Sequence, residues 1–153
     1  MKLEFLKGDN ISTKQVNYFG EARGFFAKPK ENPPAGELYP GVLIIHDRFG
    51  VNAEIKDMAQ ELALQGYVVL AVDLFGGKVV NTFGEAKKLI EETNQQKALE
   101  NMKAAIAYLR YQRNTPKIGL LGFGFGGGHA LQLSLSGVEE LAATVIYYGT
   151  PMA

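Results

Sequence analysis

Four short apolar runs, free of charge in their interiors, alternate along the chain with longer segments of helical periodicity. The runs lie at residues 41–46, 67–73, 117–121 and 141–149. Uninterrupted runs of this kind, rich in β-branched residues, are typical of strands covered on both faces. Their alternation with helices favours right-handed crossovers and a mostly parallel sheet. The sequence therefore predicts an α/β fold, a three-layer sandwich with helices on both faces of the sheet.

The remaining segments carry start and stop signals of their own. The predicted elements are a hairpin at residues 15–19 and 23–28, a loop at 29–40, a helix at 53–65, and one bent helix or two consecutive helices at 83–94 and 95–113. Asn52 is the expected N-cap of the helix at 53–65, and Gly66 is its expected stop. The strands of the hairpin alternate only weakly, which predicts an antiparallel, partly exposed pair.

The composition is that of a single globular domain over residues 1–153. Hydrophobic residues make up 46% of the chain and charged residues 21%, values that exclude a disordered or membrane-spanning protein. Sixteen basic side chains balance sixteen acidic ones, so no net field attracts nucleic acid. Charges interrupt the N-terminal residues where a signal peptide would be apolar, which predicts a cytoplasmic location. The absence of cysteine excludes disulfides, thiolate metal sites and a cysteine nucleophile.

The glycine-rich stretch at residues 122–127 is the clearest chemical motif. It follows a predicted strand and opens a helical segment, which is the context of a nucleophile elbow of the form G-x-[SC]-x-G. The middle position, where a serine or cysteine would project its reactive atom, is Gly124. The sequence therefore has the strand, turn and helix of a nucleophile elbow, but no reactive side chain at the nucleophile position.

The same glycines admit a second interpretation as a dinucleotide-binding fingerprint. Gly122, Gly124 and Gly127 fit G-x-G-x-x-G between a strand and a helix. The next predicted strand, at residues 141–149, has no acidic residue to bind a ribose, and the motif follows two parallel strands instead of opening the fold. The match is therefore weak. No histidine, aspartate or glutamate cluster has the spacing of a metal site, so no metal or other cofactor is expected.

Five separated stretches resemble the dienelactone hydrolase family of the α/β-hydrolase fold. They are GVLIIHDRFGVN at 41–52, DMAQELALQGYVVLAVDLFG at 57–76, YLR at 108–110, GFGFGG at 122–127 and YYG at 147–149. They occur in the order of the family and cover the chain from residue 41 onward, about the N-terminal two-thirds of the family fold. The resemblance implies hydrolysis of a carboxylic ester or lactone through a covalent acyl-enzyme.

The resemblance also assigns roles to individual positions. Gly124 falls on the position of the cysteine nucleophile, and Asp47 on a glutamate that contacts the resting thiol. The backbone N–H groups of Arg48 and Phe125 fall on the oxyanion hole. In the family, two further strands carry the aspartate and histidine of the triad, and these strands are expected to lie beyond this sequence. We therefore expect the chain to be inactive by itself. The alternative is a non-catalytic remnant that binds a small carboxylate or pairs with another chain.

Two of these residues have a structural interpretation beside the functional one. His46 ends a predicted parallel strand, on the side where α/β sheets bind ligands, and is either a binding residue or a hydrogen-bonded strand end. Asp47 either belongs to the site or caps its own loop, and as a carboxylate it would repel an anion bound nearby. His129, on an apolar helical segment, is expected in the core.

The run at residues 141–149 has a consequence for assembly. If the two further strands of the family fold are absent, this run is the edge of the sheet, and it contains no charge or proline to block pairing. The sequence therefore predicts association through this edge, with a second copy or with a separate chain.

Overall fold

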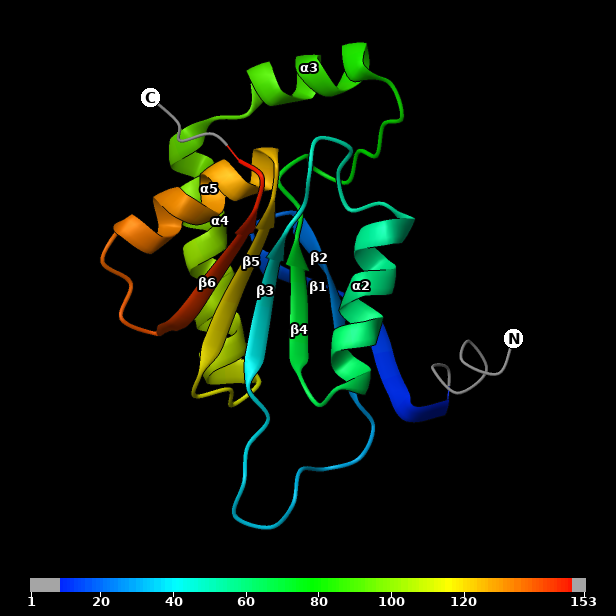
Figure 1. The fold of residues 1–153 in the computed structure, drawn as a ribbon, viewed down its shortest axis with the longest axis vertical. Helices are drawn as coiled ribbons and strands as arrows, with labels where there is room; N and C mark the ends of the chain where they lie inside the picture. The colour runs from blue at the N-terminus through cyan, green and yellow to red at the C-terminus, as the bar shows by residue number, and fades with distance from the viewer. Residues whose placement is uncertain (1–8, 150–153) are drawn as a thin grey trace.

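One mixed sheet organises the computed structural model, which describes residues 9–149 (Figure 1). The strands are β1 (Ile11–Phe19), β2 (Ala22–Pro29), β3 (Gly41–Ile45), β4 (Val68–Val72), β5 (Ile118–Phe123) and β6 (Leu141–Tyr147). Their order across the sheet is β1-β2-β4-β3-β5-β6. β3 pairs in parallel with β4 and β5, and β5 pairs in parallel with β6, whereas β1 and β2 form an antiparallel hairpin joined antiparallel to β4. The predicted mostly parallel sheet and the predicted hairpin are both confirmed.

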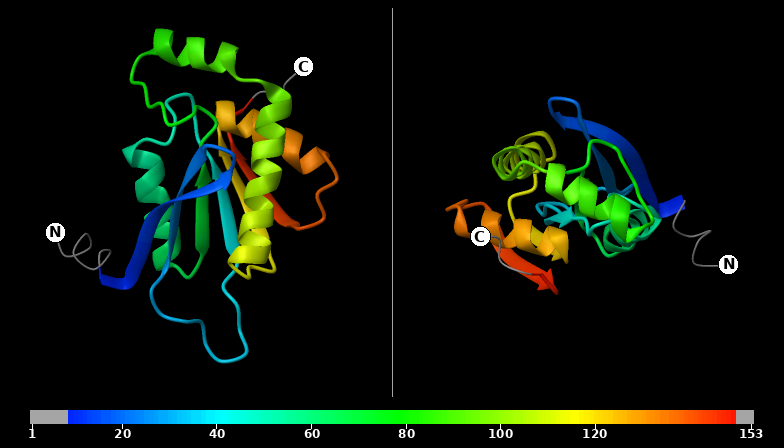
Figure 2. Two further views of the ribbon diagram at one scale, coloured as in Figure 1. Left: turned by 180° about the vertical axis from the view of Figure 1, so that it is seen from behind. Right: turned by 90° about the horizontal axis from the view of Figure 1, so that it is seen from above.

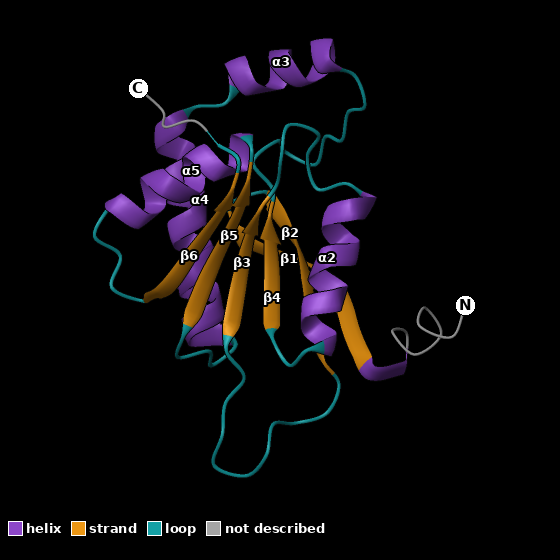
Figure 3. Ribbon diagram, viewed as in Figure 1, coloured by secondary structure: helices purple, strands orange, loops and turns teal. Residues whose placement is uncertain are grey.

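Helices cover both faces of this sheet, as a three-layer sandwich requires. They are α2 (Ala53–Leu64), α3 (Phe83–Glu92), α4 (Gln95–Ala107) and α5 (Phe125–Leu135), and a π-helical turn, η1 (Tyr108–Gln112), continues α4. α2 lies on one face, while α4 and α5 lie on the other (Figures 1 and 2). α3 extends across the end of the sheet toward which the parallel strands point (Figure 3). No helix within residues 9–149 is long and apolar enough to cross a bilayer.

The structure separates α3 from α4, which settles the two possibilities that the sequence left open. Thr93 has an extended backbone, with φ −73° and ψ 118°, so the helical path is broken there. Each of the two helices has its own N-cap: Thr82 Oγ1 accepts from Glu85 N–H, and Asn94 Oδ1 accepts from Lys97 N–H. Asn52 caps α2 in the same way through Ile55 N–H, as predicted.

Two apolar cores form because successive side chains of a strand face opposite sides of the sheet. In β5, Leu120 packs into the core beneath α4 and α5, whereas the adjacent Leu121 packs against the core beneath α2. All five residues of β4 are buried, which explains its uninterrupted apolar sequence. The differences from the sequence prediction are confined to the ends of elements: β1 begins at Ile11, and α5 begins at Phe125.

A buried polar network attaches the hairpin to the rest of the molecule. The Tyr18 hydroxyl donates to Asn101 Oδ1, and Asn101 Nδ2 donates to the Asp73 carbonyl at 3.0 Å. Burial raises the pKa of Tyr18, so the phenol keeps its donor proton. The Asp73 carboxylate accepts from Phe75 N–H at 2.8 Å and from Gly77 N–H, and this fixes the loop that follows β4. The loop carries Phe75 toward the candidate site.

Candidate functional site

The turn between β5 and α5 lies where the parallel strands end, and Gly124 is its central residue. Gly124 has φ 53° and ψ −112°, a conformation that L side chains rarely adopt. Its N–H donates to the carbonyls of Tyr147 and Tyr148, which ties the turn to the end of β6. The strand, the turn and the helix expected from the sequence are therefore present, and α5 begins immediately after Gly124.

The Asp47 carboxylate fills the space beside this turn. Its Oδ1 accepts from Arg48 N–H at 2.7 Å and from Phe125 N–H at 3.4 Å. Its Oδ2 accepts from the Tyr148 hydroxyl at 3.0 Å. A Cβ placed on Gly124 would overlap Asp47 Oδ1 and would lie 3.0 Å from Tyr148 Cε2. The two backbone donors thus converge on one carboxylate oxygen, at the place that a side chain on residue 124 would need.

The structure brings together the four residues that the resemblance singled out. Asp47 and Arg48 follow β3, Gly124 and Phe125 join β5 to α5, and these two segments meet at this single turn. Asp47 accepts both from the N–H of its neighbour in the loop and from the N–H of Phe125 in α5, so the geometry does not decide between the two interpretations that the sequence left open. The catalytic and oxyanion-hole roles of these residues stay predictions.

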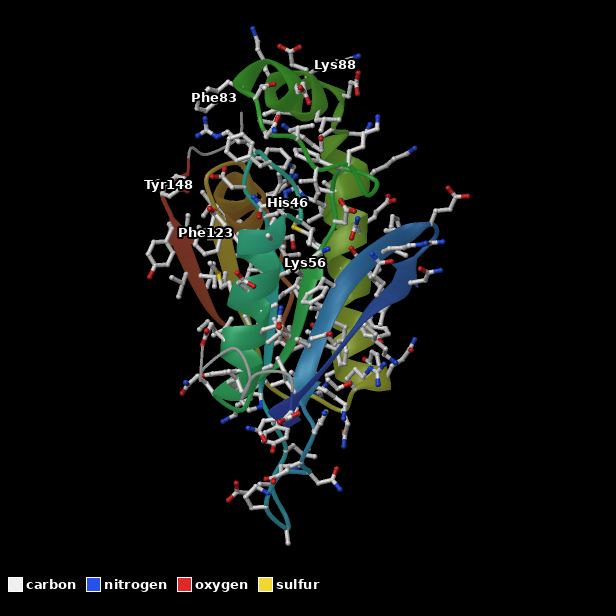
Figure 4. The ribbon with its side chains drawn as sticks, turned by 90° about the vertical axis from the view of Figure 1, so that its right-hand side faces the viewer. His46, Lys56, Phe83, Lys88, Phe123 and Tyr148 are labelled. Carbon is white, nitrogen blue, oxygen red and sulfur yellow. The ribbon has the colours of Figure 1, made fainter. Side chains whose placement is uncertain are left out.

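His46 lies behind the turn, completely buried (Figure 4). Its Nε2 accepts from Leu74 N–H at 3.0 Å, so the ring proton lies on Nδ1, which donates to the Asp47 carbonyl at 2.7 Å. Burial lowers the pKa of His46 and keeps the imidazole neutral. Both ring nitrogens therefore have backbone partners and join the ends of β3 and β4. The binding role predicted for His46 stays a prediction, and no free nitrogen supports it in this arrangement.

Four aromatic rings support the turn from the inside. Phe75 stacks on Phe125 with ring centroids 5.2 Å apart, and His46 lies 4.7 Å from Phe75. His129 meets Phe125 edge to face at 4.6 Å. His129 is buried, as expected, and burial together with the nearby His46 lowers the pKa of His129 to about 4. These contacts hold Phe125, and with it the backbone N–H that reaches Asp47.

The glycines around the turn have a packing function. A Cβ on Gly122 would lie 2.7 Å from Ala130 Cβ, and a Cβ on Gly126 would overlap the carbonyl oxygens of Ile45 and His46. The absent side chains let α5 approach β3 and β5 closely. Of the three glycines that fit a dinucleotide fingerprint, Gly122 thus has an explanation in the close contact of α5 with β5.

A cleft of about 740 Å³ opens between α3 and the N-terminus of α5. Its lining includes Arg48, Phe83, Lys87, Ile90, Phe125 and His129. The Arg48 guanidinium lies 5.1 Å from the Phe83 ring centroid, within the range of a cation–π interaction. The cleft therefore combines an apolar wall with the Arg48 cation and with an ion pair between Lys87 and Glu91 of α3, whose charged atoms lie 3.9 Å apart.

Sequence reasoning missed two parts of this site. It did not place α3 over the turn, because the path of a helix across the strand ends depends on loop geometry and not on periodicity. It also gave no role to Tyr148, although Tyr148 belongs to the stretch YYG that carried part of the resemblance. Within residues 9–149, no group of three histidine, aspartate or glutamate side chains could hold a metal ion.

Comparison with known proteins supports the family resemblance found in the sequence. The family described as the dienelactone hydrolase family matches residues 22–153. A carboxymethylenebutenolidase of Pseudomonas putida is 30% identical over 126 residues, which are 76% of this chain and 52% of that protein. The Usf protein of Aquifex pyrophilus is 30% identical over 139 residues, 86% of this chain and 58% of its own length.

A solved structure extends the comparison to three dimensions. The dienelactone hydrolase-like promiscuous phosphotriesterase P91, from metagenomic libraries, superimposes with a TM-score of 0.79 at 25% identity. The match covers 94% of this chain and 61% of P91. The chain spans about half the length of the curated relatives that it matches. Its sequence and its overall fold agree with these relatives, and the chain belongs to the dienelactone hydrolase family.

Proposed function

We propose that the turn at Gly124 binds the carbonyl or carboxylate oxygen of a small ester, lactone or carboxylate, and that this chain performs no acyl transfer through residue 124. The observation that carries the proposal is the convergence of Arg48 N–H and Phe125 N–H on one oxygen of Asp47. A ligand oxygen needs the same two donors. The position at the N-terminus of α5 adds the field of the helix dipole, which favours negative charge.

In this proposal Asp47 is the internal occupant that a ligand displaces. Rotation of its side chain releases both N–H donors, and the Tyr148 hydroxyl then loses its acceptor. The apolar wall of Phe83 and Ile90 suits the carbon skeleton of a ligand, and Arg48 suits a second carboxylate. The class of ligand follows from the family and from relatives such as the carboxymethylenebutenolidase.

Catalytic turnover needs more than the two backbone donors of Arg48 and Phe125. An acyl-enzyme requires a nucleophilic atom at residue 124, and glycine has none. The chain contains no cysteine, so no thiol could take over from another position. We therefore propose that the 153-residue chain hydrolyses 4-nitrophenyl acetate no faster than an unrelated protein does. Saturable hydrolysis that survives repurification would contradict this, and His46→Ala would then be the first variant to test.

Binding can be tested separately with benzoate as the probe, by ¹⁵N chemical shifts. The amide signals of Arg48 and Phe125 should move together as benzoate is added. Asp47→Ala should tighten benzoate binding about tenfold or more, because it removes a competing carboxylate from the same donors. Asp57→Ala removes one exposed carboxylate from α2 and is the matched control for net charge. Shifts elsewhere but not at these two amides, or equal affinity in both variants, would reject the proposed site.

A second function has its own observation in favour of it. β6 is at one end of the strand order within residues 9–149, and six of its seven residues are exposed. We therefore also propose that the chain pairs with another polypeptide through β6. The cytoplasmic location expected from the sequence stays a prediction.

A further inference from the structure

The cleft beneath α3 has two ends of different chemistry. At the end beside the turn lie Gly124 and Arg48, where the proposed oxygen-binding donors converge. The lining of the cleft also includes Thr93, Gln95 and His129, which we call its far end: α3 passes into α4 there, and His129 lies further along α5 than the turn. All lining residues come from position 48 and from 83–95 and 124–129, so the cleft involves neither edge strand of the sheet.

His129 is a buried polar side chain that packing leaves unsatisfied. It is 2% exposed, and its Nδ1 has no hydrogen-bond partner within residues 9–149. The other polar groups of the far end differ from it, because the Thr93 hydroxyl donates to the Leu89 carbonyl at 2.7 Å and Gln95 is exposed to water. Burying a polar group without a partner costs free energy. A histidine here is therefore less stable than an apolar residue of similar size, unless a ligand supplies a hydrogen bond.

The enclosed Nδ1 indicates which ring nitrogen of His129 carries the proton. Burial lowers the pKa of His129 to about 4, so at pH 7 the imidazole is neutral and has one N–H and one unprotonated nitrogen. A buried N–H without an acceptor is rarer in proteins than a buried acceptor with a free lone pair. The proton is therefore assigned to Nε2, and Nε2–H is the donor that the ring can offer to the cleft.

The helix α5 sets the distance between the two polar contacts of the cleft. His129 follows Phe125 by four residues, which is about 6 Å along the helix axis. The His129 ring meets the Phe125 ring edge to face, with centroids 4.6 Å apart. Ala86 and Ile90 of α3 also line the cleft, so the surface that accompanies the two contacts is apolar. A carboxylate and a hydroxyl at opposite ends of a benzene ring span a comparable length.

We propose that His129 Nε2–H binds the hydroxyl oxygen of a hydroxylated carboxylate whose carboxylate group occupies the turn at Gly124. The inference rests on the proposed function of that turn, and it names the second polar group of the ligand. A neutral imidazole supplies a hydrogen bond but no charge. A second carboxylate at this buried position would lose its hydration without gaining a cation, so the group that His129 binds is an uncharged one.

Two probes of nearly equal size, 4-hydroxybenzoate and 4-methylbenzoate, differ only in the group that would reach His129. The wild-type chain should bind 4-hydroxybenzoate about three- to tenfold more tightly than 4-methylbenzoate, which is the net effect of one hydrogen bond. His129→Phe keeps a ring against Phe125 but removes the donor, so this preference should disappear. Gln132→Leu is the matched control and should keep it, because Gln132 Oε1 is also buried without a partner but Gln132 lies on α5 outside the lining of the cleft.

The ring nitrogens of His129 report the contact without any variant. In ¹⁵N spectra of the wild-type chain at pH 7, His129 should be the Nε2–H tautomer, and its Nε2 signal should move with 4-hydroxybenzoate and much less with 4-methylbenzoate. An Nδ1–H tautomer, equal affinity for the two probes, or a preference for the hydroxyl that survives in His129→Phe would overturn the inference. If the Arg48 and Phe125 amides still respond to benzoate, the proposed turn stands and only this inference fails. If benzoate does not bind, both fail.

Discussion

The carboxylate of Asp47 lies where a side chain on Gly124 would stand. This placement makes the two residues complementary: the glycine leaves room for the carboxylate, and the carboxylate satisfies two backbone donors at the start of α5. A larger residue at position 124 therefore meets two obstacles, the positive φ and the side chain of Asp47.

Comparing Gly124→Cys with Gly20→Cys separates the cost of the positive φ from the cost of the overlap with Asp47. Gly20 has φ +55°, close to the +53° of Gly124, but a Cβ on Gly20 would have nothing within 4 Å. Both variants should lose about 1–3 kcal/mol through backbone strain, and Gly124→Cys should lose more because Asp47 must move. Urea unfolding measures the difference, and Asp47→Ala should reduce it, leaving only the contact of the new Cβ with Tyr148. Neither variant should hydrolyse 4-nitrophenyl acetate; catalytic turnover by Gly124→Cys would mean that a base lies within reach.

Gly126→Ala should strongly destabilise the fold. Its Cβ would overlap two backbone carbonyls of β3 and the loop after it, and backbone cannot move aside as a flexible side chain can. We expect a loss of about 3 kcal/mol or more in the free energy of unfolding. Gly84→Ala is the matched control, a helical glycine with nothing within 4 Å, and should stabilise α3 by about 0.5–1 kcal/mol. Similar unfolding midpoints for the two variants would contradict the close contact of α5 with β3.

Asp47→Asn should lower the pKa of Tyr148. The hydrogen bond to Asp47, followed by the charge of its carboxylate, raises the pKa of Tyr148, because ionisation would lose the bond and bring two negative charges together. Without that charge the phenol should ionise at a lower pH. The ¹³Cζ signal of Tyr148 followed through alkaline pH gives the value directly. Asp57→Asn should leave this titration unchanged, and an unchanged titration in Asp47→Asn would mean that Tyr148 does not bind Asp47 in solution.

His129→Leu should make the stability of the protein less sensitive to acid. The pKa of His129 falls from 6.5 in the unfolded chain to about 4 in the folded one. Between these values the unfolded chain binds more protons, so the free energy of unfolding decreases as the pH falls through this window. Once His129 is fully protonated in both states, the loss in the free energy of unfolding is about 3 kcal/mol, at 1.36 kcal/mol per pKa unit.

The measurement is urea unfolding of wild type and His129→Leu at pH 7, 5.5 and 4. The wild type should lose more stability between pH 7 and pH 4. Some loss should persist in the variant, because burial also lowers the pKa of His46. Parallel pH dependences in the two proteins would show that His129 is accessible to protons in the folded state.

The parallel strands could be predicted from the sequence alone. A strand buried on both faces is an uninterrupted apolar run, and this pattern can be recognised without knowing which strands pair with it. β3 and β4 appear at the predicted positions to within one or two residues. The N-cap Asn52 could be predicted equally well, because its side chain accepts a hydrogen bond from a residue only three positions along the chain. The extent of β1 was not, because the pairing of Ile11 with Pro29 depends on the partner strand.

The site was predictable only in part, for a similar reason. The resemblance brought Asp47, Arg48 and Phe125 to one turn, but not the direction of the Asp47 side chain. Asp47 and Tyr148 are separated by 101 positions in the chain, and their hydrogen bond exists only once β6 lies beside β5. The position of α3 over the turn could likewise not be predicted from the sequence. The chain changes direction at Thr93, where α3 ends, and periodicity does not report the direction of a helix.

The position of α3 bears on how fast a ligand enters and leaves. Only Ala86 and Leu89 of this helix are buried, and its two ends are separated from the neighbouring elements by non-helical residues. A segment with so few buried contacts is the kind that opens locally while the rest of the fold stays closed. If the turn binds a carboxylate as proposed, the residence time of that carboxylate should depend on how often α3 opens as well as on the strength of two hydrogen bonds.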